Sequence, residues 1–597
     1  MRMLERFTGR ARRVVVPVRR SDPDRRADGP GRPRRGGVLT MVGAGDVDHL
    51  DPALAYHTVT RGIVRAYTRQ LVGYPAGRDR EAAGRIVADL ATEVPSAANG
   101  RVAARGTRYT FTLRDGVCWN TPSGARPVTA QDVVRGIKRL AHPMAPSPGL
   151  PYFLSTIDGM AEFRDALARG PRTPEAIAER MEHTGVRGMR AVGTTEVVFT
   201  IRHPATDFLN MLALPFATPA PAEYLPHVPG SPELNETLMS NGPYEVTRHV
   251  RGRRITLGRN PAWAPETDGL RAAHVDGVDI RQGVSEEDAY ELVASGAADM
   301  LWDVQPLTAR LPDLLRTGDP RLEVCPAGLL SPYLVINVVS PNEGNATGDR
   351  KVRQALQYAV DKAAVSLVWG GPRLNDIADQ ILPPLCTAHR EFRPYRTEGG
   401  RGDPERAGRL LAEAGYPEGL TLRLVFRDAD IHPETAETVK VALARAGIRV
   451  KTVPASINEF FDDYLSSSSA AREGAWDIAL TGWEPDWYGN NARTYLQPLF
   501  GSRGVADNGD WGSNFGRYRN EKVDDLLDAA LTSESQKRAA GFFRRLEEEV
   551  MRDAAVVPIL FAHQYWFHST RVRNWLPYPV LNGDLTNLWL GDAPSGA

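Results

Sequence analysis

The sequence predicts an α/β protein built around a parallel sheet. Between residues 403 and 488, segments with strand character alternate with helical segments, and this alternation is typical of parallel strands joined by crossover helices. The composition is that of a globular protein, because 42% of the 597 residues are apolar and 24% are charged. We therefore expect a large folded body of several domains, rather than a fibrous or mostly disordered chain.

The first 36 residues differ from the rest of the chain. They contain twelve arginines and four acidic residues, whereas the whole chain balances 73 basic against 73 acidic residues. Ser21–Gly37 is rich in Arg, Asp, Pro and Gly, a composition typical of disordered segments. We expect residues 1–36 to form a disordered basic tail, which is either simply solvated or in contact with anionic lipid or nucleic acid.

The sequence lacks the motifs of several enzyme classes. None of the seven lysines follows a glycine, as a phosphate-binding P-loop requires, and neither GxSxG nor HExxH occurs. Cys118, Cys325 and Cys386 are far apart, so we expect no CxxC redox site and no cysteine-based zinc site; one disulfide between two of them stays open. The body beyond residue 36 is mildly acidic, which argues against a nucleic-acid partner. We expect no catalytic residues, no metal and no cofactor.

Three strands are expected in the N-terminal half of the body. Tyr109–Leu113 alternates apolar with other residues and is followed by the turn sequence Arg114–Gly116, which predicts a hairpin. The other two strands are expected at Val38–Val42 and Glu196–Ile201.

One helix in this half carries a clear start signal. Thr129 is a good N-cap residue, and Asp132 follows three positions later, close to the pattern of a capping box. We expect this helix to run to about Leu140. Residues 160–190 are expected to be helical and polar, with breaks at Gly and Pro.

The segment that predicts the parallel sheet begins with a helix marked at both ends. Asp403 is its N-cap, Pro404 takes the first helical position and Gly415 ends it. The strands that follow are expected at Leu420–Phe426, Ile448–Val453 and Trp476–Trp483, and the helices between them at Pro433–Ala446 and Ile457–Leu465.

Aromatic and acidic residues follow the third of these strands. The segment Gly482–Tyr488 holds three aromatic and two acidic residues, with a proline that stiffens the turn. Ligands of parallel sheets bind beyond the carboxyl ends of the strands, and aromatic walls with a carboxylate suit an organic cation that carries apolar groups. The alternative is that Trp483 and Trp487 pack between domains while Asp486 caps the loop. The residues alone do not decide between these two interpretations.

Short motifs also recur in a fixed order between residues 37 and 591. They are Gly37–Val42 with Leu50-Asp-Pro52, Tyr109–Trp119, Pro127–Val134, Asn241–Tyr244, Arg259–Pro261, Val352–Asp361 and Ala412–Tyr416. Each motif is weak alone, but the ordered series resembles that of one family. This family is the extracytoplasmic solute-binding proteins of ABC transporters, family 5, which contains the oligopeptide- and dipeptide-binding proteins.

This resemblance implies a periplasmic-binding-protein-like fold of type II, cluster C. Such a fold is bilobal, with an extra domain inserted in lobe one and two segments that cross between the lobes. The expected parts are lobe one at residues 37–80, 205–328 and 553–597, the additional domain at 81–204, lobe two at 329–552, and crossings at Tyr333–Val338 and Val556–Phe561.

The resemblance further implies a binding protein rather than an enzyme. Its two lobes would close on a short peptide or a similar amine-bearing solute, which it would deliver to the permease subunits and ATPase of an ABC importer. In peptide binders of this family, an Asp in a Trp-x-x-Asp turn holds the ammonium group of the ligand; Trp483-Glu-Pro-Asp486 matches this turn, which makes Asp486 the expected partner. The other ligand-binding residues expected are Trp483, Trp487 and Tyr488 as apolar walls, with Tyr56 and His57 facing them from lobe one.

The resemblance also implies an extracytoplasmic, monomeric protein that is associated with the membrane through its transporter. Neither a signal peptide nor a lipid-anchor cysteine is readable in the chain. After Asp486, relatives commonly continue with a second acidic residue and Pro, whereas this chain has Gly489-Asn490-Asn491, so ligand length and identity stay open. A ligand-sensing regulator, or a binder of a nickel complex, haem or an oligosaccharide, remains an alternative because a fold does not fix its ligand.

Overall fold

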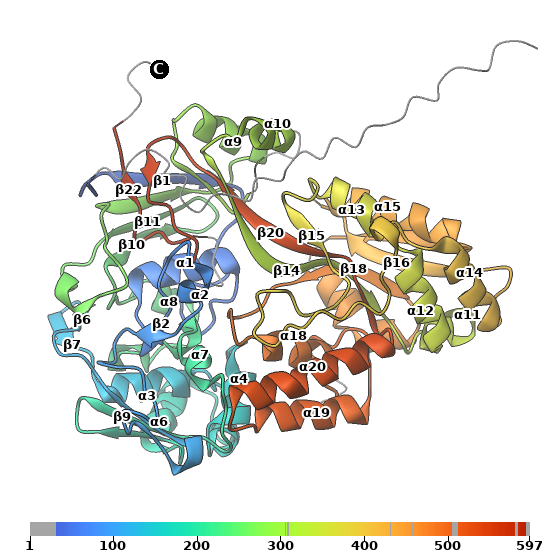
Figure 1. The fold of residues 1–597 in the computed structure, drawn as a ribbon. Helices are drawn as coiled ribbons and strands as arrows, with labels where there is room; N and C mark the ends of the chain where they lie inside the picture. The colour runs from blue at the N-terminus through green and yellow to red at the C-terminus, as the bar shows by residue number, and fades with distance from the viewer. Residues whose placement is uncertain are drawn as a thin grey trace, which may run out of the picture.

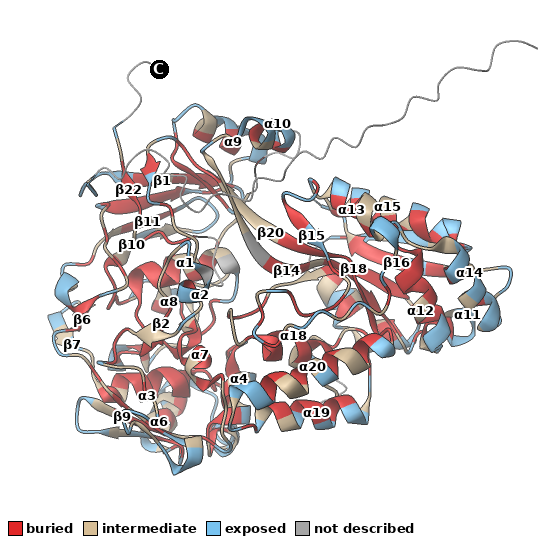
Figure 2. Cartoon of the chain, in the orientation of Figure 1, coloured by how far each residue is buried: buried red, intermediate tan, exposed pale blue. Residues whose placement is uncertain are grey.

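The computed structural model describes residues 32–304, 306, 310–429, 431–456, 459–503, 511–578 and 583–592. Residues 1–31, most of the expected basic tail, lie outside this part. The chain forms two halves that are joined by a pair of long strands (Figure 1). In both halves the strands are largely buried, whereas many helices turn an exposed face outward (Figure 2).

A five-stranded mixed sheet forms the core of the first half, in the order β10-β11-β12-β1-β13. β1 (Val38–Gly43) lies between two parallel neighbours, β12 (Gly277–Arg281) and β13 (Met300–Trp302). β10 (Tyr244–Val250) and β11 (Arg254–Arg259) continue the sheet as antiparallel strands. The strand expected at the start of the body is therefore confirmed, and it is one residue longer.

A four-stranded antiparallel sheet occupies the lower part of this half, in the order β4-β5-β9-β8 (Figure 1). Its central pair is β5 (Arg108–Thr112) and β9 (Glu196–Thr200), with full pairing between residues 108–112 and 196–200. Both strands were expected from the sequence and are confirmed. The outer strands are the short β4 (Val102–Ala103) and β8 (Met189–Val192).

The prediction of a hairpin after β5 is wrong. The turn sequence Arg114–Gly116 leads out of the sheet, and the next strand, β6 (Cys118–Thr121), pairs with β7 (Gly124–Pro127) instead. The physical reason is that the backbone N–H of Arg114 donates to the carbonyl of Leu90 at 2.7 Å, which anchors the turn outside the sheet. β5 instead pairs with β4 on one side and, on the other, with β9, which follows almost ninety residues later in the chain.

The helix of this half begins as its capping signal predicts. α3 (Ala130–Arg139) has Thr129 as its N-cap, and the side chains of Thr129 and Asp132 each accept a hydrogen bond from the other residue's backbone N–H. The polar helical region is confirmed as α5 (Met160–Ala168) and α6 (Pro174–His183).

The second half contains the expected parallel unit. β16 (Leu420–Arg427) runs parallel to both β17 (Ile448–Ala455) and β18 (Ile478–Trp483), so the order at this end of the sheet is β18-β16-β17. Two of the expected helices are confirmed as α14 (Pro404–Glu413), capped by Asp403, and α15 (His432–Arg445). The third helix is only partly described, as a π-helical turn over residues 460–465, because residues 457 and 458 lie outside the described part.

Two long antiparallel strands, β14 (Leu322–Ile336) and β20 (Leu560–Phe567), run from one half to the other (Figure 1). The end of β14, Tyr333–Ile336, pairs with β18 and with β19 (Val556–Pro558) inside the sheet of the second half. The two segments expected to cross between the lobes thus lie in or beside this pair of strands. The residue boundaries of the lobes and of the additional domain stay predictions.

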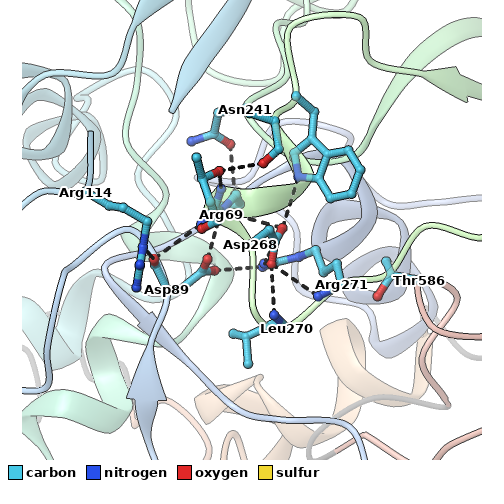
Figure 3. Close-up of polar contacts among 12 residues, drawn as sticks. Arg69, Asp89, Arg114, Asn241, Asp268, Leu270, Arg271 and Thr586 are labelled. Carbon is cyan, nitrogen blue, oxygen red and sulfur yellow. Dashed lines mark hydrogen bonds and ion pairs between the residues drawn. The ribbon is translucent and has the colours of Figure 1, made fainter. Parts of the chain in front are cut away.

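A buried network of two arginines and two aspartates stabilises the first half (Figure 3). Asp89 accepts hydrogen bonds from Arg69 Nε and from Arg271 Nη2, each at 2.8 Å. Asp268 completes the network, at 3.2 Å from Arg271 and 3.7 Å from Arg69. These four side chains, which we call the buried quartet, are at most 1% exposed.

Three further findings concern the cysteines, metal ligands and membrane-spanning helices. Cys118, Cys325 and Cys386 are all free, so the possible disulfide does not form. In the described part of the chain, no group of three or more His, Cys, Asp or Glu residues is placed to hold a metal ion. No helix among the described residues combines the length and apolar character needed to cross a membrane.

Candidate functional site

Asp486 lies beyond the carboxyl end of β18, where three parts of the molecule meet. Its Oδ1 accepts a hydrogen bond from Arg61 Nη2 at 3.0 Å, and its Oδ2 accepts one from the hydroxyl of Tyr152. Arg61 belongs to α1 (Thr58–Tyr67) of the first half, and Tyr152 belongs to α4 (Leu150–Thr156) beside the four-stranded sheet. Asp486 is only 5% exposed, so its carboxylate is nearly closed to solvent.

Charges at the junction control the protonation of its members. Burial lowers the pKa of Arg61, but the charge and hydrogen bond of Asp486 together with Tyr56 and Glu484 outweigh burial, and the pKa is raised overall. Burial and then Asp486 raise the pKa of Tyr152 far above its usual value. Asp486 is also the main cause of the raised pKa of Tyr56, whose ring lies 5.1 Å from the guanidinium of Arg61. Arg61 is therefore charged at neutral pH, and both tyrosines are neutral.

A second set of contacts joins the halves near the junction. Arg493, in α18 (Ala492–Phe500), lies 3.4 Å from the carboxylate of Asp207 and donates to the hydroxyl of Ser155 at 2.9 Å. The side chain of Asn490 donates to the carbonyl of Thr206 at 3.1 Å. The loop after β18 and the start of α18 thus contact the first half at several points.

The chain matches the family model "Bacterial extracellular solute-binding proteins, family 5 Middle" over residues 85–507. The chain belongs to this family. It is 24% identical over 497 residues to the periplasmic oligopeptide-binding protein OppA of Salmonella typhimurium, covering 81% of each chain. It is also 27% identical over 504 residues to Heme-binding protein A of Haemophilus influenzae, covering 79% of this chain and 80% of the relative.

Solved structures of family 5 proteins have the same fold. "Clavulanic acid biosynthesis oligopeptide binding protein 2" superposes with a TM-score of 0.79 at 25% identity, covering 94% of this chain and 96% of that chain. The murein tripeptide-binding protein MppA of Escherichia coli gives 0.71 at 21% identity, with 93% and 98% covered. The bilobal periplasmic-binding-protein-like fold expected from the sequence is confirmed, and the protein is a solute-binding protein of family 5.

The structure places the other expected site residues in different surroundings. Trp487 is completely buried in the core of the first half, 5.3 Å from the ring of Tyr152, so it packs between the halves. Its role as a ligand wall stays a prediction. Tyr488 packs at the edge of the same core, whereas Trp483 packs against the core of the second half and donates to the carbonyl of Thr494 at 2.8 Å.

The two residues expected from lobe one behave differently from each other. Tyr56 is 43% exposed and lies beside Arg61, so it belongs to the junction. His57 is exposed and precedes α1, where its backbone N–H donates to Asp48 at 3.0 Å. Asp486, Trp487 and Tyr56 therefore come together around Arg61 and Tyr152.

Sequence reasoning missed Arg61, Tyr152 and Arg493. Arg61 meets Asp486 across 425 residues of chain, so no local spacing connects them. The chain also contains 66 arginines, so the residue type alone does not mark any one of them as part of a site. The one available signal was the expectation that Tyr56 and His57, which directly precede α1, face the loop after β18 from lobe one.

Proposed function

We propose that this protein captures short peptides, or a similar amine-bearing solute, between its two lobes. It would deliver them outside the cytoplasm, as a monomer and without catalysis, to the permease and ATPase subunits of an ABC importer. The observation that carries this proposal is the position of Asp486, a buried carboxylate at the junction of both halves. The names of relatives, oligopeptide-binding and di/tripeptide-binding proteins, support a peptide as the solute.

The geometry suits a solute that is enclosed when the lobes close. A buried charged group needs a partner, because an unpaired buried charge costs several kcal/mol. Asp486 offers such a partner to an ammonium group, and a hydrogen bond of this kind contributes about 1.5–3 kcal/mol. Tyr56 and Tyr152 border the same carboxylate, and their rings provide apolar surface beside it.

Haem is the second candidate, because Heme-binding protein A is 27% identical to this chain over 504 residues. The two candidates differ in charge: a peptide brings an ammonium group for Asp486, whereas haem brings carboxylates that Asp486 would repel. The same variant therefore distinguishes them. Neutralising Asp486 should weaken the binding of a peptide and should not weaken the binding of haem.

The test compares Asp486→Asn with the wild type, using calorimetry on short peptides with a free or an acetylated N-terminus. We expect the variant to bind the free peptides roughly tenfold to a hundredfold more weakly, and the acetylated peptides about as well as the wild type does. Asp428→Asn is the matched control, because Asp428 is exposed just after the neighbouring strand β16. Equal weakening of both kinds of peptide would remove Asp486 from this role.

A further inference from the structure

The carboxylate that is expected to meet the solute already has a cationic partner from its own chain. Arg61 Nη2 lies 3.0 Å from Asp486 Oδ1, while Tyr152 donates to Oδ2, so both oxygens are engaged. The Arg61 and Asp486 side chains are 6% and 7% exposed. An incoming ammonium group must therefore share Asp486 with a guanidinium group or displace it.

Arg61 retains one hydrogen-bond donor that nothing satisfies. Its Nε is buried and has no hydrogen-bond partner in the described part of the chain. A buried donor without a partner costs about 1–3 kcal/mol, and a solute that offers an acceptor there recovers this cost. The solute can therefore gain two interactions at the junction. Its cation can pair with the carboxylate of Asp486, and its anion can accept the hydrogen bond that Arg61 Nε does not make among the described residues.

The charges around the junction also indicate that the solute should bring an anion for Arg61. If an ammonium group displaces Arg61 from Asp486, the guanidinium loses its hydrogen-bonded anionic partner inside a buried interface. Glu484 also acts on Arg61 through its charge, but no hydrogen bond between the two is among the contacts of Arg61 described above, and Asp207 of the same interface is paired with Arg493. A buried cation that loses its partner is costly, so a solute that brings its own anion binds better than one that does not.

We propose that Arg61 is a specificity-determining residue that selects solutes with an anionic group close to their cationic group. The inference rests on the proposed function, because it takes Asp486 as the partner of the cation. Arg61 and Asp486 are in direct contact, so the two solute charges must also lie near each other. An extended peptide adds about 3.3–3.6 Å per residue, which favours a free amino acid or a dipeptide over a longer peptide.

The test uses two pools of random dipeptides, one with free carboxyl ends and one with C-terminal amides. Native mass spectrometry measures which peptides the wild type, Arg61→Gln and Arg65→Gln retain at equal pool concentration. We expect the wild type to retain free acids at least tenfold better than amides, and Arg61→Gln to retain both about equally. Arg65→Gln is the matched control, because Arg65 lies one turn further along α1 and pairs with Asp584 instead; it should keep the preference.

The outcomes separate this inference from the proposed function. If the wild type retains amides as well as acids, Arg61 does not select for the anion, whereas peptide capture stands. Persistence of the acid preference in Arg61→Gln would also overturn the inference. If neither pool binds to the wild type, the inference fails, whereas peptide capture is still judged by the calorimetry on free and acetylated short peptides. The comparison of acids with amides needs only the wild type, so it holds even if Arg61→Gln does not fold.

Discussion

The buried quartet and the junction at Asp486 are both made of arginines and aspartates, but they differ in completeness. In the quartet, each aspartate contacts two arginines and each arginine contacts two aspartates, all within the first half of the molecule (Figure 3). At the junction, a single arginine from one half meets a single aspartate from the other, and one nitrogen of Arg61 has no partner.

This difference follows from where each cluster lies. Charges inside a fixed core stay out of water as long as the protein is folded, so each must be fully paired there. Charges between two lobes that open and close return to water at every opening, so incomplete pairing is tolerated. The quartet is expected to stabilise the fold, whereas the junction is expected to govern closure and choice of solute.

The largest expected effect comes from breaking the quartet. Arg271→Met leaves Asp89 and Asp268 buried with only Arg69 between them, and removal of one partner from a buried ion pair costs about 3–5 kcal/mol. Urea unfolding of the two proteins measures this loss. Arg254→Met is the control, because Arg254 pairs with Asp279 at 2.6 Å but is 45% exposed; its loss should be far smaller. Equal losses of unfolding free energy in the two variants would show that burial does not determine how much an ion pair contributes to stability.

Glu547 is a buried carboxylate that has no arginine among its hydrogen-bond donors in the described part of the chain, and it can be compared with Asp89 of the buried quartet. Glu547, in α20 (Gln536–Arg552), accepts hydrogen bonds from the backbone N–H groups of Ile381 and Leu382 at 2.9 and 2.6 Å. Burial raises its pKa to about 8. For Asp89, burial acts in the same direction, but Arg271 and Arg69 outweigh it and the pKa is lowered. The two carboxylates should therefore give the stability opposite dependences on pH.

The direction of the pH dependence that Glu547 gives to the stability follows from proton binding. Between about pH 4.5 and pH 8, the folded protein holds a proton on Glu547 that the unfolded chain has lost, so its stability falls as the pH rises. Glu547→Gln removes this dependence and keeps an acceptor for the two N–H groups. We expect the variant to be more stable than the wild type at pH 8 by a few kcal/mol, and similar to it at pH 4.5. Unfolding in urea across this range checks both; an unchanged slope would contradict the assignment.

The stability that Asp89 provides is expected to disappear at the acid end instead. It is fully present above the unfolded pKa of about 3.9, and it is lost as the pH falls through the lower folded value. Acid unfolding of the wild type should therefore report on the quartet, whereas loss of stability toward pH 8 should report on Glu547.

Features set by neighbouring residues could be predicted from the sequence. The capping box of α3 depends on Thr129 and Asp132 alone, and the parallel arrangement of β16, β17 and β18 follows from the alternation of strands and helices within about eighty residues. The hairpin after β5 could not be predicted correctly, because its outcome depends on a hydrogen bond between Arg114 and Leu90.

Only the part of the site that lies in the second half of the molecule could be predicted from the sequence. The turn around Asp486 is marked by its own residues, whereas the partner on α1 is identified only once the two halves are placed together. Trp487 shows the same limit, because its local sequence suits both a ligand wall and a core residue. The packing of the first half decides that it is buried.

The smallest effect on stability is expected from the second pair that crosses the halves. Arg493 lies 3.4 Å from Asp207, and opening of the lobes returns both side chains to water. Arg493→Gln should therefore lower the free energy of unfolding less than Arg271→Met does, because opening of the lobes hydrates the Asp207 carboxylate that is left without its partner. It should still shift the solute-free protein toward more open conformations, which small-angle X-ray scattering measures as a larger radius of gyration. Arg493→Lys keeps the charge and should remain closer to the wild type. A loss of stability as large as that of Arg271→Met would mean that this contact is part of a fixed core, and that the distinction between fixed and opening clusters does not hold here.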